Sequence, residues 1–370
     1  MSIVFYVSGH GFGHASRDIE VINAVAALDP ALAIHIRTST PAWIFERTLR
    51  APAILAPGAV DTGVVQVDSL RLDARGSLVA AREFHDGLTE RAGREAAYLR
   101  EVSARLVVSD VPPLAFVAAE RAGVRSAALA NFTWDWIYAH YDDHEREAPG
   151  LVARIRDAHA HAELAWRLPM HGGFEGFRRI VDVPLVARRA RHAPDRVRRL
   201  LRLPADRTLV LVSFGGYGVS WQPGLQLRSR EFGLVLTVGA HDHREAVAAL
   251  AGENVWIVEE AVLYGAGLRY EDLVGAVDVV ATKPGYGIIS ECVANGTDLL
   301  YTDRGDFAEY AVLVEAMPAM VRAEFLSHDE LFGGNWDESL IRLQRRPRPP
   351  DVPATNGAAI VAAAIRDLLE

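Results

Sequence analysis

The sequence predicts an α/β protein with two doubly wound domains that face each other across a cleft. Three observations indicate this class. Short apolar runs typical of buried parallel strands alternate with helical stretches along the 370 residues. The alternation restarts near residue 185, which divides the chain into two similar halves. In each half a glycine-rich turn directly follows a strand-like run, at residues 9–13 and 215–218, and ligands bind at such strand ends.

The first half alternates strands and helices. Residues 3–7 (IVFYV) form an uninterrupted apolar run, as a buried parallel strand requires, and residues 18–28 form a helical pattern that ends before Asp29-Pro30. We expect this N-terminal domain to span residues 1–185. Further strands are predicted at residues 33–38, 106–109 and 126–130, and further helices at residues 83–106 and 150–165.

The second half repeats the pattern in a C-terminal domain that we expect to span residues 186–345. A helix before Asn295-Gly296 is predicted to end there, because this pair is a natural C-terminal cap. Residues 346–370 are expected to be a Pro/Arg-rich linker and a final amphipathic helix over residues 358–369. The predicted strands are residues 208–213, 232–238, 255–258, 278–282 and 298–302, after a short basic helix at residues 193–203.

The composition is that of a soluble globular protein, with half of the residues hydrophobic and a quarter charged. No apolar run is long enough to span a membrane, and no basic segment precedes the N-terminal apolar run as in a secretory signal. The single cysteine, Cys292, excludes an intramolecular disulfide. We therefore expect a cytoplasmic protein. The net charge of −9 argues against a general nucleic-acid binder.

Residues 8–17 (SGHGFGHASR) are the most informative turn. They do not fit the dinucleotide fingerprint, whose third glycine is replaced by His14, or the Walker pattern, which needs a lysine. Two histidines at one strand end serve packing poorly, so His10 and His14 are candidate general bases. Asp110, at the end of another predicted strand, is the alternative base, although it also suits a turn cap before Pro112-Pro113.

The same edge of the predicted sheet carries further candidates for binding an acceptor. Aromatic side chains at strand ends stack on sugar rings, but Trp134 suits core packing of a helix equally well. The expected cleft residues are Gly11, Phe12, Gly13, Arg17, Asn131, Trp134 and Asp135.

Residues 283–291 (KPGYGIISE) predict the donor site of the second half. Glycines open the turn, and the first N–H groups of the following helix can hold an anion. Glu291 is expected to accept hydrogen bonds from a ribose diol, although an acid near a helix N-terminus also stabilises the helix dipole. Asp306 and Glu309 are candidates for sugar hydroxyls or members of a solvated loop. The full set of expected donor-site residues is Gly215, Gly216, Tyr217, Lys283, Gly285, Tyr286, Gly287, Ser290, Glu291, Asp306 and Glu309.

No metal site is predicted. The pairs His159-x-His161 and His241-x-His243 have no acidic cluster at a metal-ligand spacing, so we expect exposed helix or loop histidines. Asp142-Asp143 is an equally weak candidate. No cofactor is expected beyond a nucleotide-sugar co-substrate.

Four motifs together resemble a known family. Residues 8–17, 131–141, 167–189 and 283–296 resemble the glycosyltransferase-like N-terminal region of plant L-arabinokinases and its stand-alone bacterial relatives, and the resemblance covers nearly all of residues 1–345. More distantly, the layout is similar to the N-acetylglucosaminyltransferase that makes lipid II. The resemblance implies the two-domain GT-B fold. It also implies that His14 matches that enzyme's loop histidine, and that Gly285, Ser290 and Glu291 match its nucleotide-holding segment.

The resemblance implies a glycosyltransferase that moves a sugar from a nucleoside-diphosphate sugar, preferably a UDP-sugar, to an acceptor hydroxyl without metal. Arabinokinases carry a sugar-kinase domain after this region, and we do not expect kinase activity here because the chain has none. A sugar-nucleotide epimerase and a non-catalytic sugar-nucleotide-binding protein are the alternatives. The expected partners are a nucleotide sugar and a small-molecule or glycan acceptor, with a second copy of the chain as a further candidate.

Overall fold

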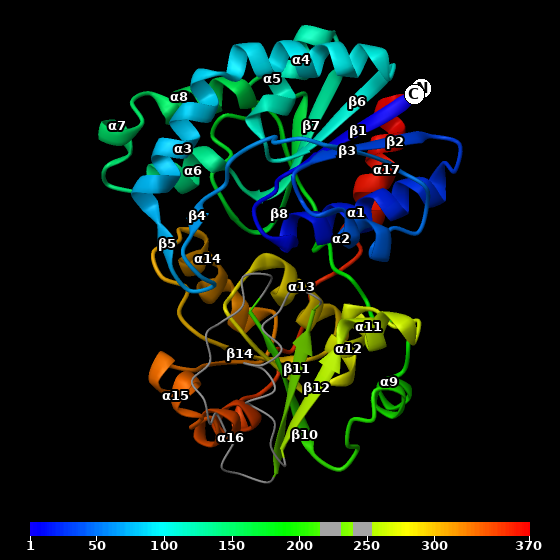
Figure 1. Cartoon of the computed structure of the whole chain (residues 1–370), viewed down its shortest axis with the longest axis vertical. Helices are drawn as coiled ribbons and strands as arrows, with labels where there is room; N and C mark the ends of the chain where they lie inside the picture. The colour runs from blue at the N-terminus through cyan, green and yellow to red at the C-terminus, as the bar shows by residue number, and fades with distance from the viewer. Residues whose placement is uncertain (215–230, 240–253) are drawn as a thin grey trace.

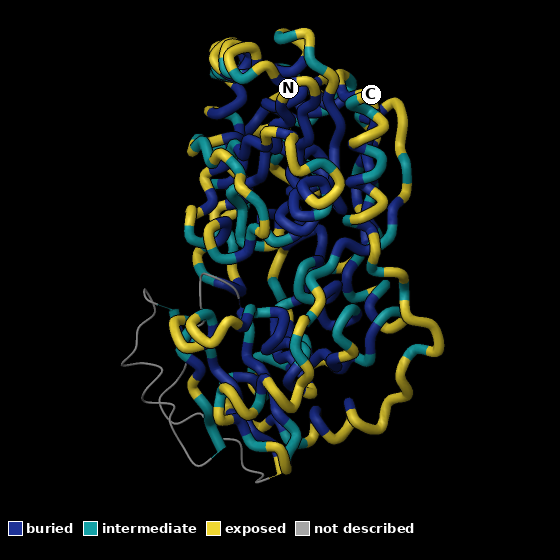
Figure 2. Tube along the Cα trace, turned by 90° about the vertical axis from the view of Figure 1, so that its right-hand side faces the viewer, coloured by how far each residue is buried: buried dark blue, intermediate teal, exposed yellow. Residues whose placement is uncertain are grey.

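The structure is a computed structural model that describes residues 1–214, 231–239 and 254–370. Two parallel β-sheets, one in each half of the chain, form the centres of two α/β domains that are stacked along the long axis of the molecule (Figure 1). Buried residues fill the interior of both domains, and exposed residues follow the outer helices (Figure 2). The doubly wound α/β class predicted from the sequence is confirmed.

The N-terminal sheet has seven strands in the order β3-β2-β1-β6-β7-β8-β9, and all of its pairs are parallel. Every residue of the central strand β1 is buried, which explains its unbroken apolar sequence. The strands are β1 (Ser2–Val7), β2 (Ala33–Thr38), β3 (Ile54–Pro57), β6 (Ala104–Asp110), β7 (Arg125–Phe132), β8 (Leu164–Gly172) and β9 (Ile180–Asp182).

Helices cover both faces of this sheet. On one face lie α1 (Phe12–Leu28), α2 (Ala42–Thr48) and the last helix of the chain, α17 (Gly357–Leu369). On the other face α4 (Leu88–Glu101) and α5 (Pro113–Ala122) pack against β1 and β6. Smaller helices extend this second layer beside β7 and β8, namely α3 (Ala74–Asp86), α6 (Trp134–Ala139), α7 (His144–Glu147) and α8 (Leu151–His159).

The C-terminal sheet has six parallel strands in the order β12-β11-β10-β13-β14-β15. They are β10 (Thr208–Ser213), β11 (Phe232–Val238), β12 (Val255–Glu259), β13 (Val279–Thr282), β14 (Asp298–Tyr301) and β15 (Ala323–Phe325). One face packs against α9 (Pro194–Leu200), α11 (Glu260–Gly265), α12 (Tyr270–Ala276), α13 (Tyr286–Asn295), α14 (Glu309–Ala316) and a 3-10 turn (Met317–Ala319). The other face packs against α15 (His328–Gly333) and α16 (Asp337–Arg345).

Each sheet has one point at which the chain reverses its direction of progress across the sheet. In the N-terminal sheet this switch point lies between β1 and β6, where Val7 pairs with Asp110. In the C-terminal sheet it lies between β10 and β13, where Ser213 pairs with Thr282. Crevices at such points are the usual ligand sites of open α/β sheets. The histidine turn and residues 283–291 therefore begin at the two topologically favoured places.

The chain crosses between the domains twice, and the two crossings touch. Val186, on the outgoing crossing, forms an antiparallel bridge with Asn356 on the returning one. Helix α17 then packs against α1, so that both chain ends lie in the N-terminal domain (Figures 1 and 2). A Cβ at Gly357 would lie 2.2 Å from the carbonyl oxygen of Pro184, so only glycine allows this close approach of the two crossings.

A small antiparallel hairpin of the N-terminal half contacts the C-terminal domain. It consists of β4 (Val65–Gln66) and β5 (Leu72–Asp73) and belongs to neither large sheet. Its tip residue Leu70 is buried within the hydrophobic core of the C-terminal domain, and Ser69 Oγ donates a hydrogen bond of 2.9 Å to the carbonyl oxygen of Phe214.

Several element boundaries differ from the prediction. Helix α1 begins at Phe12 rather than residue 18, because Gly11, at φ +70°, makes the whole turn by itself. The helix predicted over residues 83–106 is two helices that break at Gly87, and the helix predicted over residues 150–165 ends at His159. Strands β3, β8 and β9 were not predicted, because β3 is short and ends at Pro57, Arg, Pro and His interrupt the apolar pattern of β8, and β9 has only three residues.

Among the described helices, none is long and apolar enough to cross a membrane.

Candidate active site

A histidine and an aspartate meet at the switch point of the N-terminal sheet. His14 lies in the first turn of α1, and Asp110 is the last residue of β6. His14 Nδ1 is 3.0 Å from Asp110 Oδ1, and both side chains are buried. The early start of α1 produces this contact, because it turns the third helical residue back toward the end of the neighbouring strand.

Arg17 completes the group from the next turn of α1. Its Nε donates to Asp110 Oδ2 at 2.8 Å, and its NH2 group donates to Oδ1 at 2.6 Å. A third donor, NH1, bonds the side-chain oxygen of Asn131 on β7 at 2.7 Å. Burial raises the pKa of the Asp110 carboxyl, but Arg17 and His14 outweigh burial and hold this pKa below its ordinary value.

The ionised state of Asp110 fixes the tautomer of His14. A carboxylate only accepts hydrogen bonds, so the 3.0 Å contact places the proton on His14 Nδ1. Arg17 NH2 lies 3.1 Å from the same ring nitrogen because both groups donate to one carboxylate oxygen. The lone pair of His14 Nε2 is then available to accept a proton. In this arrangement Asp110 orients the histidine, whereas the sequence alone left it as an alternative base.

His10 differs from His14 in its surroundings. Its ring packs edge-on against Trp134 and lies 6.4 Å, centroid to centroid, from the ring of His14. Burial, with His14, Arg304 and Lys283 nearby, lowers the pKa of His10 well below its ordinary value, so the ring is neutral at neutral pH. Its Nδ1 faces the backbone N–H of Val64 at 3.5 Å. Among the residues that the structure describes, no carboxylate orients His10 as Asp110 orients His14.

The first turns of α1 and α13 meet across the domain boundary. A Cβ at Gly287 would lie 3.6 Å from the Cα of Gly13. Neither helix has a side-chain cap or an acidic residue in its first turn. The positive ends of the two helix dipoles therefore lie close together, and no negative charge of their own first turns offsets them. Phe12 packs on Trp43 and anchors the start of α1.

Lys283 adds charge at this boundary. The half-buried ammonium makes no hydrogen bond or ion pair with any residue that the structure describes, and it lies near Arg304. Burial and Arg304 lower the pKa of Lys283 to about 7. An anion bound between the two helix ends would therefore meet a lysine that becomes charged on binding.

Glu309 and Asn131 form a contact between the domains. Asn131 Nδ2 donates to Glu309 Oε1 at 2.8 Å, and Arg304 donates to Glu309 Oε2, also at 2.8 Å. Glu309 lies on the first turn of α14 and is buried. Asp306, in contrast, is exposed and pairs with His140 Nε2 at 2.7 Å.

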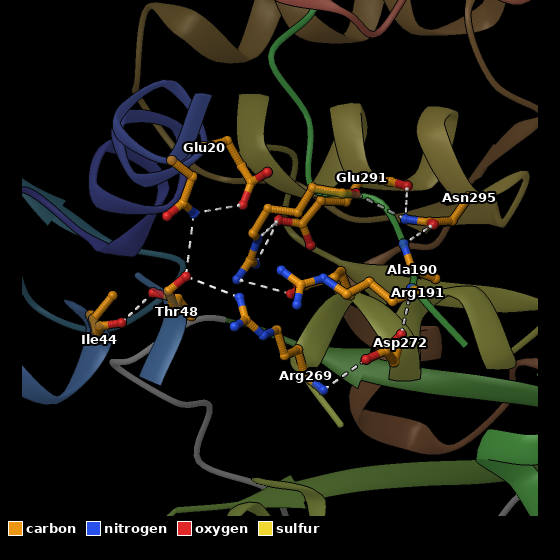
Figure 3. A network of polar contacts seen from close by, with 12 residues as sticks. Glu20, Ile44, Thr48, Ala190, Arg191, Arg269, Asp272, Glu291 and Asn295 are labelled. Atoms are coloured by element: carbon orange, nitrogen blue, oxygen red, sulfur yellow. Dashed lines mark hydrogen bonds and ion pairs between the residues drawn. The ribbon is translucent and has the colours of Figure 1, made fainter. Parts of the chain in front are cut away.

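Glu291 lies deeper in the boundary, in the second turn of α13. Arg188, on the outgoing crossing, binds Glu291 Oε1 through Nε at 2.6 Å and through NH2 at 2.5 Å. The other oxygen, Oε2, is buried and makes no hydrogen bond with any described residue. Burial raises the pKa of Glu291 to about 7 despite Arg188. Figure 3 shows Glu291 opposite Glu20 and Thr48 of the N-terminal domain, within a network that includes Arg269 and Asn295.

The other predicted donor residues are placed as follows. Tyr286 is buried between the domains; its ring faces the Arg17 guanidinium at 4.9 Å, and its hydroxyl accepts a hydrogen bond from the backbone N–H of Val186. Ser290 is buried and donates to the carbonyl oxygen of Gly287. Gly285 is the N-cap residue of α13. The predicted residues Gly215, Gly216 and Tyr217, and the pair His241 and His243, lie outside the described residues.

Two predictions for the N-terminal domain need correction. Asp135 is not with the cleft group: it is fully buried and pairs with Arg156 at 2.9 Å, because its place in α6 directs it toward α8. His159 was expected to be exposed, but it is buried 3.6 Å from Asp135 and stacks on Phe177. Burial lowers the pKa of His159 to about 4. Trp134 is buried and stacks on Tyr138, and its ring also contacts those of His10 and His14, so it packs in the core directly beside the histidine turn.

Sequence reasoning missed three residues of the site. Asp61 accepts a hydrogen bond of 2.9 Å from Trp134 Nε1 beside the histidine turn, and burial raises its pKa. Arg188 binds Glu291 and Arg304 binds Glu309, two of the three carboxylates that the sequence assigned to the donor. Asp61 lies shortly after the carboxyl end of β3, so a correct prediction of that strand would have indicated Asp61 as a site residue. Nothing in the local sequence indicates which carboxylate each arginine meets.

Comparison with known proteins supports the motif-based resemblance. The chain is 30% identical to the L-arabinokinase of Arabidopsis thaliana in an alignment of 372 positions that covers 98% of this chain and 34% of the plant protein. The chain therefore spans about a third of the length of this curated relative. No protein-family model matches the chain.

Solved structures share the whole architecture. The glycotransferase of kitacinnamycin is 16% identical with a TM-score of 0.66, covering 100% of this chain and 99% of that one. Phytolacca americana UGT2, solved with UDP-2fluoro-glucose and pterostilbene, is 11% identical with a TM-score of 0.60, covering 100% and 94%. Acinetobacter baumannii MurG is 12% identical with a TM-score of 0.53, covering 99% of each chain. The chain has the GT-B fold of these glycosyltransferases, and its sequence resembles the L-arabinokinase over almost all of its length.

Proposed function

We propose that this protein is a metal-independent glycosyltransferase that transfers a sugar from a nucleoside-diphosphate sugar, preferably a UDP-sugar, to an acceptor hydroxyl. One observation carries the proposal: an oriented histidine lies in the first turn of the same helix whose N-terminus meets that of α13. A base and an anion-binding element are thus adjacent, and they come from different domains.

The donor is held by the C-terminal domain in this proposal. The diphosphate lies at the N-terminus of α13, where backbone N–H groups and Lys283 offset its charge. Glu291 Oε2, which is buried without a partner, accepts a hydrogen bond from the ribose diol. The fold supports the proposal, because a neighbour with this fold was solved with UDP-2fluoro-glucose.

The N-terminal domain performs the proton transfer. His14 Nε2 takes the proton of the acceptor hydroxyl as that oxygen attacks the anomeric carbon and the bond to the diphosphate breaks. Asp110 stabilises the imidazolium that forms. The leaving diphosphate keeps the bond electrons and stays at the helix N-terminus.

An activity assay with matched binding measurements tests the proposal. Purified protein is incubated with a panel of nucleotide sugars, with and without a set of acceptor alcohols, and the products are separated by mass spectrometry. Transfer that needs an acceptor supports the proposal. Isomerised nucleotide sugar without acceptor would identify an epimerase, and calorimetric binding without turnover would identify a binding protein.

A further inference from the structure

A continuous chain of buried polar contacts runs from His14 in the N-terminal domain to α14 in the C-terminal domain. Each contact is a hydrogen bond of 3.0 Å or less, and no member of the chain is more than slightly exposed up to Glu309. The contacts are His14 to Asp110, Asp110 to Arg17, Arg17 to Asn131, Asn131 to Glu309, and Glu309 to Arg304.

Asn131 is the point at which this chain crosses the domain boundary. Its oxygen accepts from Arg17 and its nitrogen donates to Glu309, so the orientation of the amide is fixed from both sides. Without Glu309, the nitrogen would retain only a contact of 3.3 Å with the carbonyl oxygen of Met170. Arg17 itself contacts the C-terminal domain through the ring of Tyr286, whose centroid lies 4.9 Å from the guanidinium.

We propose that Glu309 is a positioning residue that acts on the His14–Asp110 pair through Asn131 and Arg17, so that the base is fully ordered only when the domains are together. This inference rests on the proposed function, since it assigns His14 the role of base. It differs from a role of Glu309 in binding the donor sugar, because each carboxylate oxygen already accepts a hydrogen bond within the protein, one from Asn131 and the other from Arg304.

The physical reason is the geometry of Arg17. Its guanidinium is a rigid planar fork, and two of its donors hold both oxygens of Asp110. Because NH1 is held by Asn131, rotation of the amide tilts the fork and turns the carboxylate away from His14 Nδ1. The other ionisable groups around His14 are His10 and Asp61. Neither forms an ion pair with it, so neither replaces Asp110.

A charge swap across the boundary tests the proposal. Asn131→Asp places a second carboxylate against Glu309 while it still accepts a bond from Arg17, so it breaks the boundary contact by repulsion. Adding Glu309→Gln restores the contact, because the introduced amide donates to the introduced carboxylate and its oxygen still accepts from Arg304. Glu260→Gln is the control. It removes an ion pair of 2.8 Å with Arg47, which also joins the domains but is not part of the series of contacts from His14 to Arg304.

Two measurements read the result. The first is the proton resonance of His14 Nδ1, assigned by its absence from His14→Gln, and its rate of exchange with solvent. The second is kcat and the donor KM for whichever nucleotide sugar is used. We expect Asn131→Asp to accelerate the exchange and to lower kcat roughly 10- to 100-fold with little change in the donor KM. In the double variant the proton exchange rate and kcat should return most of the way to the wild-type values. Glu260→Gln should resemble the wild type in both.

The outcomes separate this inference from the proposed function. Unchanged proton exchange in Asn131→Asp, or no recovery in the double variant, would overturn the positioning role. A raised donor KM that the second substitution does not correct would show that Glu309 binds the sugar instead. If the wild type transfers no sugar, the proposed function fails while the exchange measurement still decides the structural coupling. Asn131→Ala serves as the breaking variant if the introduced carboxylate prevents folding, as judged by circular dichroism.

Discussion

His14 Nδ1 and Asp110 Oδ1 lie 3.0 Å apart although 96 positions separate the two residues in the chain. The contact exists because β1 and β6 are neighbours at the switch point of the N-terminal sheet and end at the same level. The contact orients the ring of His14, which we propose as the base. It also separates His14 and Asp110 from His10, the third residue that the sequence nominated for that role.

His14→Ala should lower turnover about 10²–10⁴-fold, because it removes the general base. Nucleotide affinity should change far less, because the donor is held by the C-terminal domain. His10→Ala, measured beside it for turnover and by calorimetry, should lose less activity because no carboxylate orients His10. Near-full turnover in both variants would place the base elsewhere.

Asp110→Asn should also slow turnover without weakening nucleotide binding. The amide can present a donor to His14 Nδ1 and so favour the wrong tautomer, and it leaves Arg17 without its charged partner. Since loss of a buried partner destabilises the fold, the thermal unfolding midpoint must be measured in parallel. A variant that is folded at the assay temperature and retains wild-type kcat would contradict the orienting role of Asp110.

We expect the protein to take up protons when it binds a nucleoside diphosphate at about pH 8. The pKa of Lys283 is about 7 in the free protein, so the amine is mostly neutral there, and a bound diphosphate restores its charge. Calorimetry with UDP in two buffers of different ionisation enthalpy measures this uptake. Lys283→Met should abolish the uptake and weaken binding, most strongly at lower pH where the wild-type lysine is already charged. Equal uptake in both proteins would exclude Lys283 from the site.

Glu291→Gln should change how stability depends on pH. Because the pKa of Glu291 rises from 4.5 to about 7 on folding, the folded wild type binds more protons than the unfolded chain between these values, and its stability falls as the pH rises through them. The variant lacks this pH dependence. Its free energy of unfolding, relative to that of the wild type, should therefore rise by roughly 3 kcal/mol between pH 4.5 and about pH 7. Urea unfolding at several pH values measures the difference. A constant difference would show that Glu291 ionises normally.

Transfer should persist in excess EDTA. In the proposed mechanism a helix N-terminus and Lys283 offset the charge of the diphosphate, which a metal ion does in other transferases. The assay compares initial rates with and without chelator after dialysis. Turnover that stops in chelator and returns with manganese or magnesium would reveal a metal requirement.

The sequence predicted the parts of the fold that depend on local patterns. Strands at residues 33–38, 208–213 and 232–238 match the structure at both ends, because each is an apolar run closed by polar or glycine residues. The end of α13 before Gly296 was also predictable, since only this glycine readily takes the observed φ of +70°. Strand β8 escaped prediction because its carboxyl half carries Pro169 and His171.

The residues of the candidate site were more predictable from the sequence than the hydrogen bonds that join them. Glycine turns and strand ends placed His14, Asp110, Asn131 and Lys283 at the right edge of the right sheets. Their hydrogen-bond partners depend on packing between domains, to which a single sequence gives no access. Glu309 was nominated for a sugar hydroxyl because its segment follows a predicted strand of the second half. Its contact with Asn131, 178 positions away in the chain, could not be predicted. The prediction for Asp135 was wrong because consecutive residues of a helix lie on different faces. Asp135 therefore points away from the side of α6 on which Trp134 lies.

The return of α17 to the first domain has a consequence for biosynthesis. Val361 and Ile365 of this helix are buried against the layer that contains α1, so one hydrophobic face of the N-terminal domain stays uncovered until α17 has left the ribosome. The C-terminal domain, whose elements are contiguous in sequence, can complete its core earlier. Domains usually mature in the order of synthesis. Here the domain made first is completed after the one that follows it, and a chaperone that shields α1 during translation would act on a surface that the folded protein covers with α17.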